Sequence, residues 1–300
     1  MMNLLKGNRI KTMAKSHFGK CALCGEEKEL TFEHIPPRAA FNTKPARPVH
    51  LMSILSQKNK YPWDTKGLPY DNLQKGMGKY SLCKDCNNLT GTYYGEEYKK
   101  LAYLAARVIS DSKTSHHSSV RFKCIYPLRF IKQVCSMFCS VEPDNRNLDE
   151  LRHFVLDKDA TSIDTARYKI SMYFTDSELI KFTGMNVVVK IGSSKPILVS
   201  ELTVPPMGFL LYYSIDANTM FEGVDITPLS NFGYDDAIDL DIPVDIREMH
   251  NAFPLDYRSK DEIIQAINEA EKIKERILPH NNDDGGTDAP YKCEVHPDNA

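Results

Sequence analysis

The sequence predicts an α+β fold, and three features that follow one another along the chain predict it. The first is a stretch rich in proline and glycine that is enclosed by two pairs of cysteines, Cys21/Cys24 and Cys83/Cys86. The second is a set of segments with helical periodicity. The third is a series of β-branched and aromatic runs bounded by Gly, Pro and Ser, which is typical of an antiparallel sheet. With 300 residues, of which 42% are hydrophobic and 26% charged, the chain can form one large domain or two ordinary ones.

Residues 1–20 are a basic leader that lacks the apolar segment of a secretory signal. No apolar run approaches the roughly 18–20 residues that span a bilayer, so we expect an intracellular, cytoplasmic protein. The charge is unevenly divided, because residues 1–115 carry 19 Lys and Arg against 10 Asp and Glu, and the rest of the chain carries 19 against 30. This asymmetry indicates two domains and favours contact of the basic one with nucleic acid. The alternative is a lysine-rich surface that only keeps the chain soluble.

The elements are expected in the following order. Apolar residues recur at steps of three and four from Tyr94 to Val108, which predicts a helix over 93–110. Residues 110–119 read as a linker. Further helices are expected at 126–141, 147–156 and 259–277, and strands at 168–174, 185–191, 195–204 and 208–215. The sequence thus predicts a mixed α+β domain of unknown role over 120–280, with an antiparallel sheet and flanking helices, and a disordered tail over 281–300. A homodimer or protein contact through 120–280 is one possible use of it.

The two C-x2-C pairs predict a structural zinc site. Each pair can present two thiolates from a tight turn, and together they complete a closed tetrahedral set, Cys21, Cys24, Cys83 and Cys86. The alternative is four buried or incidental cysteines, which the paired spacing disfavours. Disulfides are also disfavoured, because no signal peptide is recognised. Cys135 and Cys139 lie one turn apart in an apolar segment, so we expect them in the core.

A possible second site adjoins the first. Glu33 and His34 follow the first cysteine pair, and Asn87 follows the second. Carboxylate and amide oxygens suit Mg²⁺ or Mn²⁺ better than zinc, and an imidazole beside such a cation can act as a general base. Zinc binding would bring these three residues together. The alternatives are a surface carboxylate, a structural histidine and a helix-capping asparagine, with Asn88 as another candidate ligand.

The order C-x2-C, Glu-His-Ile-Pro-Pro, C-x2-C-Asn resembles the HNH endonuclease family, in a version with an acidic residue in place of the first His and Asn in the last position. The resemblance covers residues 18–110. It implies a zinc-stapled ββα-metal HNH domain over 21–115 that hydrolyses phosphodiester bonds of DNA, with RNA also possible. His34 would activate water, while Glu33 and Asn87 would bind a catalytic Mg²⁺ or Mn²⁺.

The chain departs from the family pattern in the central asparagine, for which Asn72 is the best candidate, although it lies farther from His34 than is usual. Residues 38–80 would then be a long insertion that contacts DNA. Two other functions stay open from the sequence. One is a catalytically inactive, zinc-stapled nucleic-acid-binding module, and the other is an effector subunit controlled through its C-terminal domain.

Overall fold

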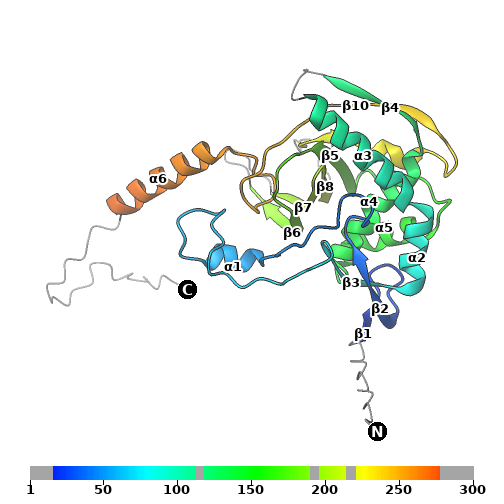
Figure 1. Ribbon diagram of the computed structural model, residues 1–300, viewed down its shortest axis with the longest axis horizontal. Coiled ribbons are helices and arrows are strands. Elements are labelled where there is room, and N and C mark those ends of the chain that lie inside the picture. The colour runs from blue at the N-terminus through cyan, green and yellow to red at the C-terminus, as the bar shows by residue number, and fades with distance from the viewer. Residues whose placement is uncertain (1–15, 113–117, 190–195, 214–220, 278–300) are drawn as a thin grey trace, which may run out of the picture. The chain divides into compact units, whose positions relative to one another are not determined.

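The computed structural model describes residues 16–112, 118–189, 196–213 and 221–277 (Figure 1). The chain divides into two compact units, residues 1–259 and residues 260–300. Most of the predicted leader, part of the predicted linker and the predicted tail lie outside the described residues.

The N-terminal region is built on a three-stranded antiparallel sheet in the order β1-β2-β3. Its strands are β1 (His17–Lys20), β2 (Glu27–His34) and β3 (Gly78–Cys83). Strand β1 uses the last four residues of the predicted leader. The long segment between β2 and β3 holds one short helix, α1 (Leu51–Ser56), and an isolated bridge between Ala46 and Leu73. Its many prolines and glycines explain why it forms so little regular structure.

Two helices follow β3 without a linker. Helix α2 (Lys84–Tyr93) begins directly after Cys83, and helix α3 (Gly95–Ser112) follows it. The sequence predicts one helix from residue 93, but Tyr93 closes α2, and Tyr94 adopts a non-helical conformation as its C-terminal cap. The predicted apolar stripe is correct for α3, because Tyr98, Leu101 and Ala105 are each 1% exposed.

Helix α4 (Pro127–Val141) lies in the interior. Of its residues, only Arg129 and Val141 are not buried, and Cys135 and Cys139 are core residues as expected. A 3-10 turn (Arg146–Leu148) leads into α5 (Asp149–Leu156). One continuous hydrophobic cluster joins buried residues of both halves of the chain, among them Cys83, Tyr98, Phe130 and Phe209. The sheet that carries the cysteines is therefore packed on the same core as the segments that follow it.

The second sheet has five antiparallel strands in the order β6-β7-β8-β5-β9. They are β5 (Tyr168–Phe174), β6 (Lys181–Val188), β7 (Ile197–Val204), β8 (Met207–Tyr213) and β9 (Val224–Asp225). Strand β6 begins earlier than the predicted 185–191. Its first residue, Lys181, is a buried lysine paired with Glu201 at 3.3 Å, so its charge hides the strand from a hydrophobicity pattern.

The remaining elements complete the α+β architecture. Strands β4 (Ser119–Ile125) and β10 (Ile238–Pro243) form a two-stranded antiparallel ribbon that the sequence did not predict. A 3-10 helix spans Thr227–Asn231, and the second unit contains helix α6 (Lys260–Ile277). The predicted class, mixed α+β with antiparallel sheets, is confirmed. Among the described residues, no helix combines the length and the apolar character needed to cross a membrane.

Candidate functional site

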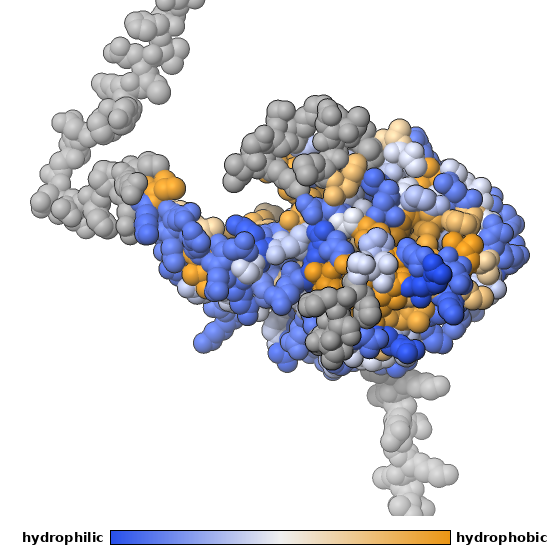
Figure 2. Space-filling model, turned by 90° about the horizontal axis from the view of Figure 1, so that it is seen from above, coloured by the Kyte–Doolittle hydropathy of each residue, from blue (hydrophilic) through white to orange (hydrophobic). Residues whose placement is uncertain are grey.

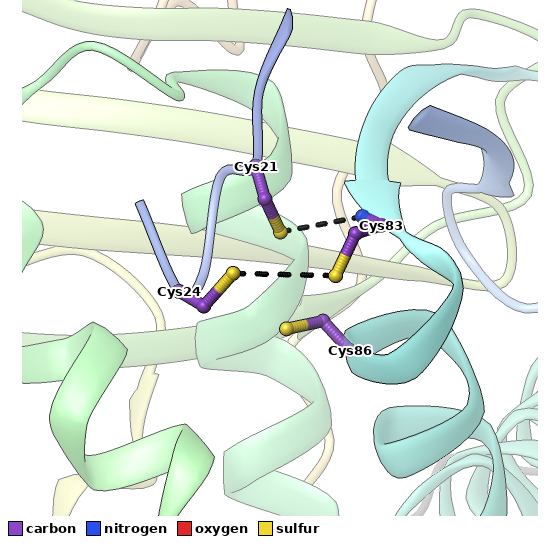
Figure 3. A group of neighbouring side chains, drawn as sticks. All are labelled: Cys21, Cys24, Cys83 and Cys86. Atoms are coloured by element: carbon purple, nitrogen blue, oxygen red, sulfur yellow. Dashed lines mark hydrogen bonds between the residues drawn. The ribbon is translucent and has the colours of Figure 1, made fainter. Parts of the chain in front are cut away.

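The four paired cysteines converge on one point (Figure 3). Cys21 and Cys24 lie in the turn between β1 and β2, Cys83 ends β3, and Cys86 lies in the first turn of α2. Their sulfur atoms all lie within 4.8 Å of one another, and the Cys24 and Cys83 sulfurs are 4.0 Å apart. A tetrahedral zinc with four sulfur ligands at about 2.3 Å holds them about 3.8 Å apart. This cluster can therefore hold a metal ion such as zinc.

Hydrogen bonds from backbone N–H groups hold Cys21 in place within this cluster. The Cys83 N–H donates to the Cys21 sulfur at 3.3 Å, and the Gly25 N–H donates to the Cys21 carbonyl at 2.9 Å. Gly25 has a φ of 72°, which only glycine adopts without strain. A hydrogen bond from Cys86 lowers the pKa of the Cys21 thiol to about 4. Burial raises the pKa of Cys24, and the hydrogen bond with Cys21 raises that of Cys86. The four sulfurs can therefore all be thiolates only with a cation among them, and their spacing fits a metal.

Glu33 lies near the end of β2, opposite Lys79 of β3, and is only 7% exposed. Burial raises the pKa of its carboxyl group to about 8. Within the described part of the chain, the carboxylate has neither a hydrogen bond nor an ion pair. An ionised carboxylate in this position is costly unless a cation or a proton compensates it. At neutral pH the carboxyl group is therefore protonated unless a cation lies beside it.

His34 ends β2, and its Nε2 atom lies 3.2 Å from the carbonyl oxygen of Lys75. A carbonyl can only accept, so Nε2 carries the proton and Nδ1 has the free lone pair. The ring meets the Phe32 ring edge to face at 5.1 Å between centroids. Burial, and then the nearby positive charges of Arg38 and Lys75, lower the pKa of His34. The imidazole is therefore neutral near pH 7, the state that a general base needs.

Asn87 is the fourth residue of α2, and its side chain faces strand β2. Its Nδ2 donates to Thr31 Oγ1 at 2.9 Å, and Thr31 Oγ1 donates to the Leu82 carbonyl. Thr31 and Glu33 are two residues apart on β2, so they share a face of the strand at a spacing of about 7 Å. Asn87 and Glu33 thus lie on the same side of β2. Within the described residues, no hydrogen bond joins Asn87 to Glu33 or His34.

Sequence reasoning missed Asn42, which is 4% exposed. Its Nδ2 donates to the carbonyls of Pro36 and Met77, each at 2.7 Å, and its Oδ1 accepts from the Met77 N–H at 2.7 Å. These bonds tie together the two ends of the long insertion. Gly76, next to Met77, has a φ of 107°, and a Cβ there would lie 2.3 Å from the Asn42 carbonyl oxygen.

The side chain that joins the ends of the insertion is therefore Asn42 and not Asn72. Asn72 is exposed, and its Oδ1 accepts from Gln74 Nε2 at 2.6 Å. By fixing Met77, Asn42 also fixes the preceding segment, whose Lys75 carbonyl holds the His34 ring. The only signal in the sequence is an asparagine eight residues after His34, which is too weak to single it out.

The cysteine turn is also tied to the rest of the unit. Arg152 of α5, 8% exposed, donates from Nε to the carbonyl of Ala22 at 2.8 Å and from a terminal nitrogen to the carbonyl of Pro143 at 2.8 Å. Lys79 donates to the Val141 carbonyl at 3.1 Å. The position of the first C-x2-C pair thus depends on residues outside the predicted 21–115 domain.

No family model matches the chain, and neither a curated protein nor a solved structure matches it. The site itself offers a cluster of four cysteines, a buried carboxyl group, a neutral imidazole and an amide side chain, all on the same small sheet and the helix that follows it.

Proposed function

We propose that the chain is a metal-dependent endonuclease that hydrolyses phosphodiester bonds of DNA, with the HNH family as its model. The order of β2, β3 and α2 supports this proposal, because it is the ββα order that the resemblance implies. The observation that carries the proposal is the buried, partnerless carboxyl group of Glu33, which precedes His34 in the chain, together with the hydrogen bond that orients the His34 imidazole.

Each residue has a chemical role in this proposal. A divalent cation held by the Glu33 carboxylate and the Asn87 amide oxygen would supply positive charge for the phosphorane-like transition state and the departing oxygen. His34 Nδ1 takes a proton from the attacking water as the new P–O bond forms and the P–O3′ bond breaks. The Lys75 carbonyl keeps the ring in the tautomer with its proton on Nε2. The cysteine cluster has no part in this step. It joins the β1–β2 turn to the end of β3 and the start of α2.

The positive charges near His34 support a phosphate-containing substrate. Arg38 and Lys75 lie close enough to lower the pKa of this residue, and residues 1–115 as a whole are basic. Basic residues near the proposed catalytic histidine attract the anionic backbone of nucleic acid. A small uncharged substrate would not account for this arrangement.

The test is cleavage of supercoiled plasmid and labelled oligonucleotides with Mg²⁺ or Mn²⁺. We expect His34→Ala to lose at least about 100-fold in rate, because general-base catalysis contributes about 10²–10⁴-fold. The matched control is His153→Ala, an exposed histidine of α5, which should keep full activity. Metal content and thermal unfolding of His34→Ala should equal those of the wild type.

Full activity in His34→Ala would refute the proposed role of this residue. DNA binding without any cleavage by the wild type would instead support the non-catalytic, zinc-stapled module. Activity that appears only with an added protein or small ligand would support the effector subunit.

A further inference from the structure

Phe41 has an unusual backbone and an unusual exposure. It lies seven residues after His34, has a φ of 65° and is 42% exposed. A bulky residue is rare in this left-handed region, which glycine or asparagine normally occupies. Such strain persists only where the surroundings enforce it, and it is found preferentially at functional sites. Here the enforcing neighbour is Asn42, through its three hydrogen bonds.

The ring of Phe41 meets a second exposed aromatic ring. The centroids of Phe41 and Tyr103 are 4.5 Å apart and the rings are tilted by 39°. Tyr103 is 49% exposed on α3, whose opposite face is anchored in the core by Tyr98 and Leu101. Two aromatic side chains from distant parts of the sequence are therefore held together at the surface on rigid supports.

Tyr103 also lines a shallow groove along α3 with a volume of about 520 Å³. The other lining residues include three basic side chains and one acidic one: Lys99, Lys100, Arg107 and Glu96. The Lys99 and Lys100 ammonium groups lie 3.0 Å from Glu96 and 3.7 Å from Glu97, respectively. The Lys99–Glu96 pair is exposed on both sides and is therefore weak, whereas Glu97 is buried and Lys100 also donates to the Cys124 carbonyl.

The groove does not end at Arg107. A second hollow of about 420 Å³ shares Leu104 and Arg107 with it and reaches Val120 and Arg121 of β4. In the view from above, hydrophobic residues come to the surface among hydrophilic ones (Figure 2). Basic side chains that follow a groove, together with exposed rings, are the arrangement with which proteins bind single-stranded nucleic acid: the cations track the phosphates and the rings stack on bases.

We propose that Phe41 and Tyr103 form an aromatic platform on which an unstacked base stacks, from the DNA strand whose phosphodiester is cut at His34, and that the strand continues along the α3 groove. The enzyme then prefers single-stranded or locally unpaired DNA to continuous duplex. This inference rests on the proposed function. Two hydrogen bonds connect Phe41 to the His34 site. Asn42, the residue after Phe41, accepts a hydrogen bond from the Met77 N–H. The Met77 carbonyl in turn accepts from the N–H of Ile35, the residue after His34.

The binding test uses the full chain with His34→Ala, so that substrate is not consumed, and fluorescence anisotropy of one labelled oligonucleotide, single-stranded or in duplex. Tyr103→Ala and Phe41→Gly should each weaken single-strand binding about tenfold, within the range for loss of one base–aromatic stack. Duplex binding should change less than about threefold. Tyr103→Phe keeps the ring and should bind like the parent. Phe41→Gly suits the backbone at this position, so the melting temperature should be kept.

Cleavage by the same variants with His34 intact separates the two proposals. The wild type should cut single strands faster than duplex, and Tyr103→Ala should lose most of that preference. If the wild type cuts DNA but Tyr103→Ala and Phe41→Gly keep its affinity and its preference, the aromatic platform is wrong and the nuclease assignment stands. If the wild type neither binds nor cuts DNA, both proposals fail.

Discussion

Replacing Asn42 with alanine tests whether the geometry around His34 depends on this buried side chain. The substitution removes three hydrogen bonds of 2.7 Å. The Met77 carbonyl keeps its bond from the Ile35 N–H at 3.1 Å, but the Pro36 carbonyl and the Met77 N–H lose their only such partner within the described residues. Each buried polar group left unpaired costs about 1–3 kcal/mol.

The expected loss of stability is therefore about 2–4 kcal/mol, after some relaxation of the loop and entry of water. For a unit of this size, about 1 kcal/mol corresponds to about 2–4 °C, so the melting temperature should fall by about 4–16 °C. If the proposed function is correct, the rate of DNA cleavage should also fall about 100-fold, because displacing a catalytic group by about 1 Å has an effect of this size. The displacement would come from the Lys75 carbonyl, which orients the His34 ring.

Thermal unfolding by calorimetry and plasmid cleavage are measured on the same preparations. Asn72→Ala is the matched control, because Asn72 is an exposed asparagine of the same insertion, and it should change stability by no more than about 0.5 kcal/mol. Asn42→Asp should be at least as damaging as Asn42→Ala, since a carboxylate oxygen would face two carbonyl oxygens. Wild-type melting temperature and activity in Asn42→Ala would refute the reasoning.

Three further changes have definite expected results. Cys83→Ser should lose most of the bound zinc and unfold at lower temperature, whereas Cys124→Ser, an exposed cysteine outside the cluster, should keep the metal; elemental analysis and melting curves check both. Because burial raises the pKa of Glu33 from 4.5 to about 8, its contribution to stability is full below pH 4.5 and is lost as the pH rises to about 8. Without added divalent cation, Glu33→Gln should remove this decline from the calorimetric pH profile, and an identical profile in both proteins would contradict it. Arg152→Ala should destabilise the fold by about 2–4 kcal/mol, since it leaves the carbonyls of Ala22 and Pro143 without this donor. It should also speed the release of zinc to a chelator. An unchanged rate of release would show that Arg152 does not stabilise the cysteine cluster.

Helices and strands were predictable where side-chain periodicity is strong. Helices α3, α4 and α5 and strands β5, β7 and β8 lie within a few residues of their predicted positions, because each has an apolar face or a continuous apolar run. Helix α2 was not predicted from periodicity, since only Cys86 and Thr90 of it are buried. Strands β4 and β10 were missed because acidic residues alternate along β10, and it pairs with a strand more than 100 residues away in the sequence.

The candidate sites divide in the same way. The paired spacing of the cysteines predicted their cluster, and their sulfur atoms converge as a metal site requires. The proposed roles of Glu33, His34 and Asn87 are still predictions. The importance of Asn42, by contrast, arises from three bonds to backbone groups, and no residue type in the sequence specifies such bonds.

The sequence by itself determined the α+β class, the four-cysteine metal ligand set and the main helices, because residue type and local spacing encode these properties directly. Tertiary structure alone decided that Asn42 joins the ends of the insertion, that Arg152 holds the first cysteine turn and that Phe41 meets Tyr103. These contacts join segments 35 to 130 residues apart. They depend on how the sheet, the insertion and the helices pack on one core, which local sequence patterns do not specify.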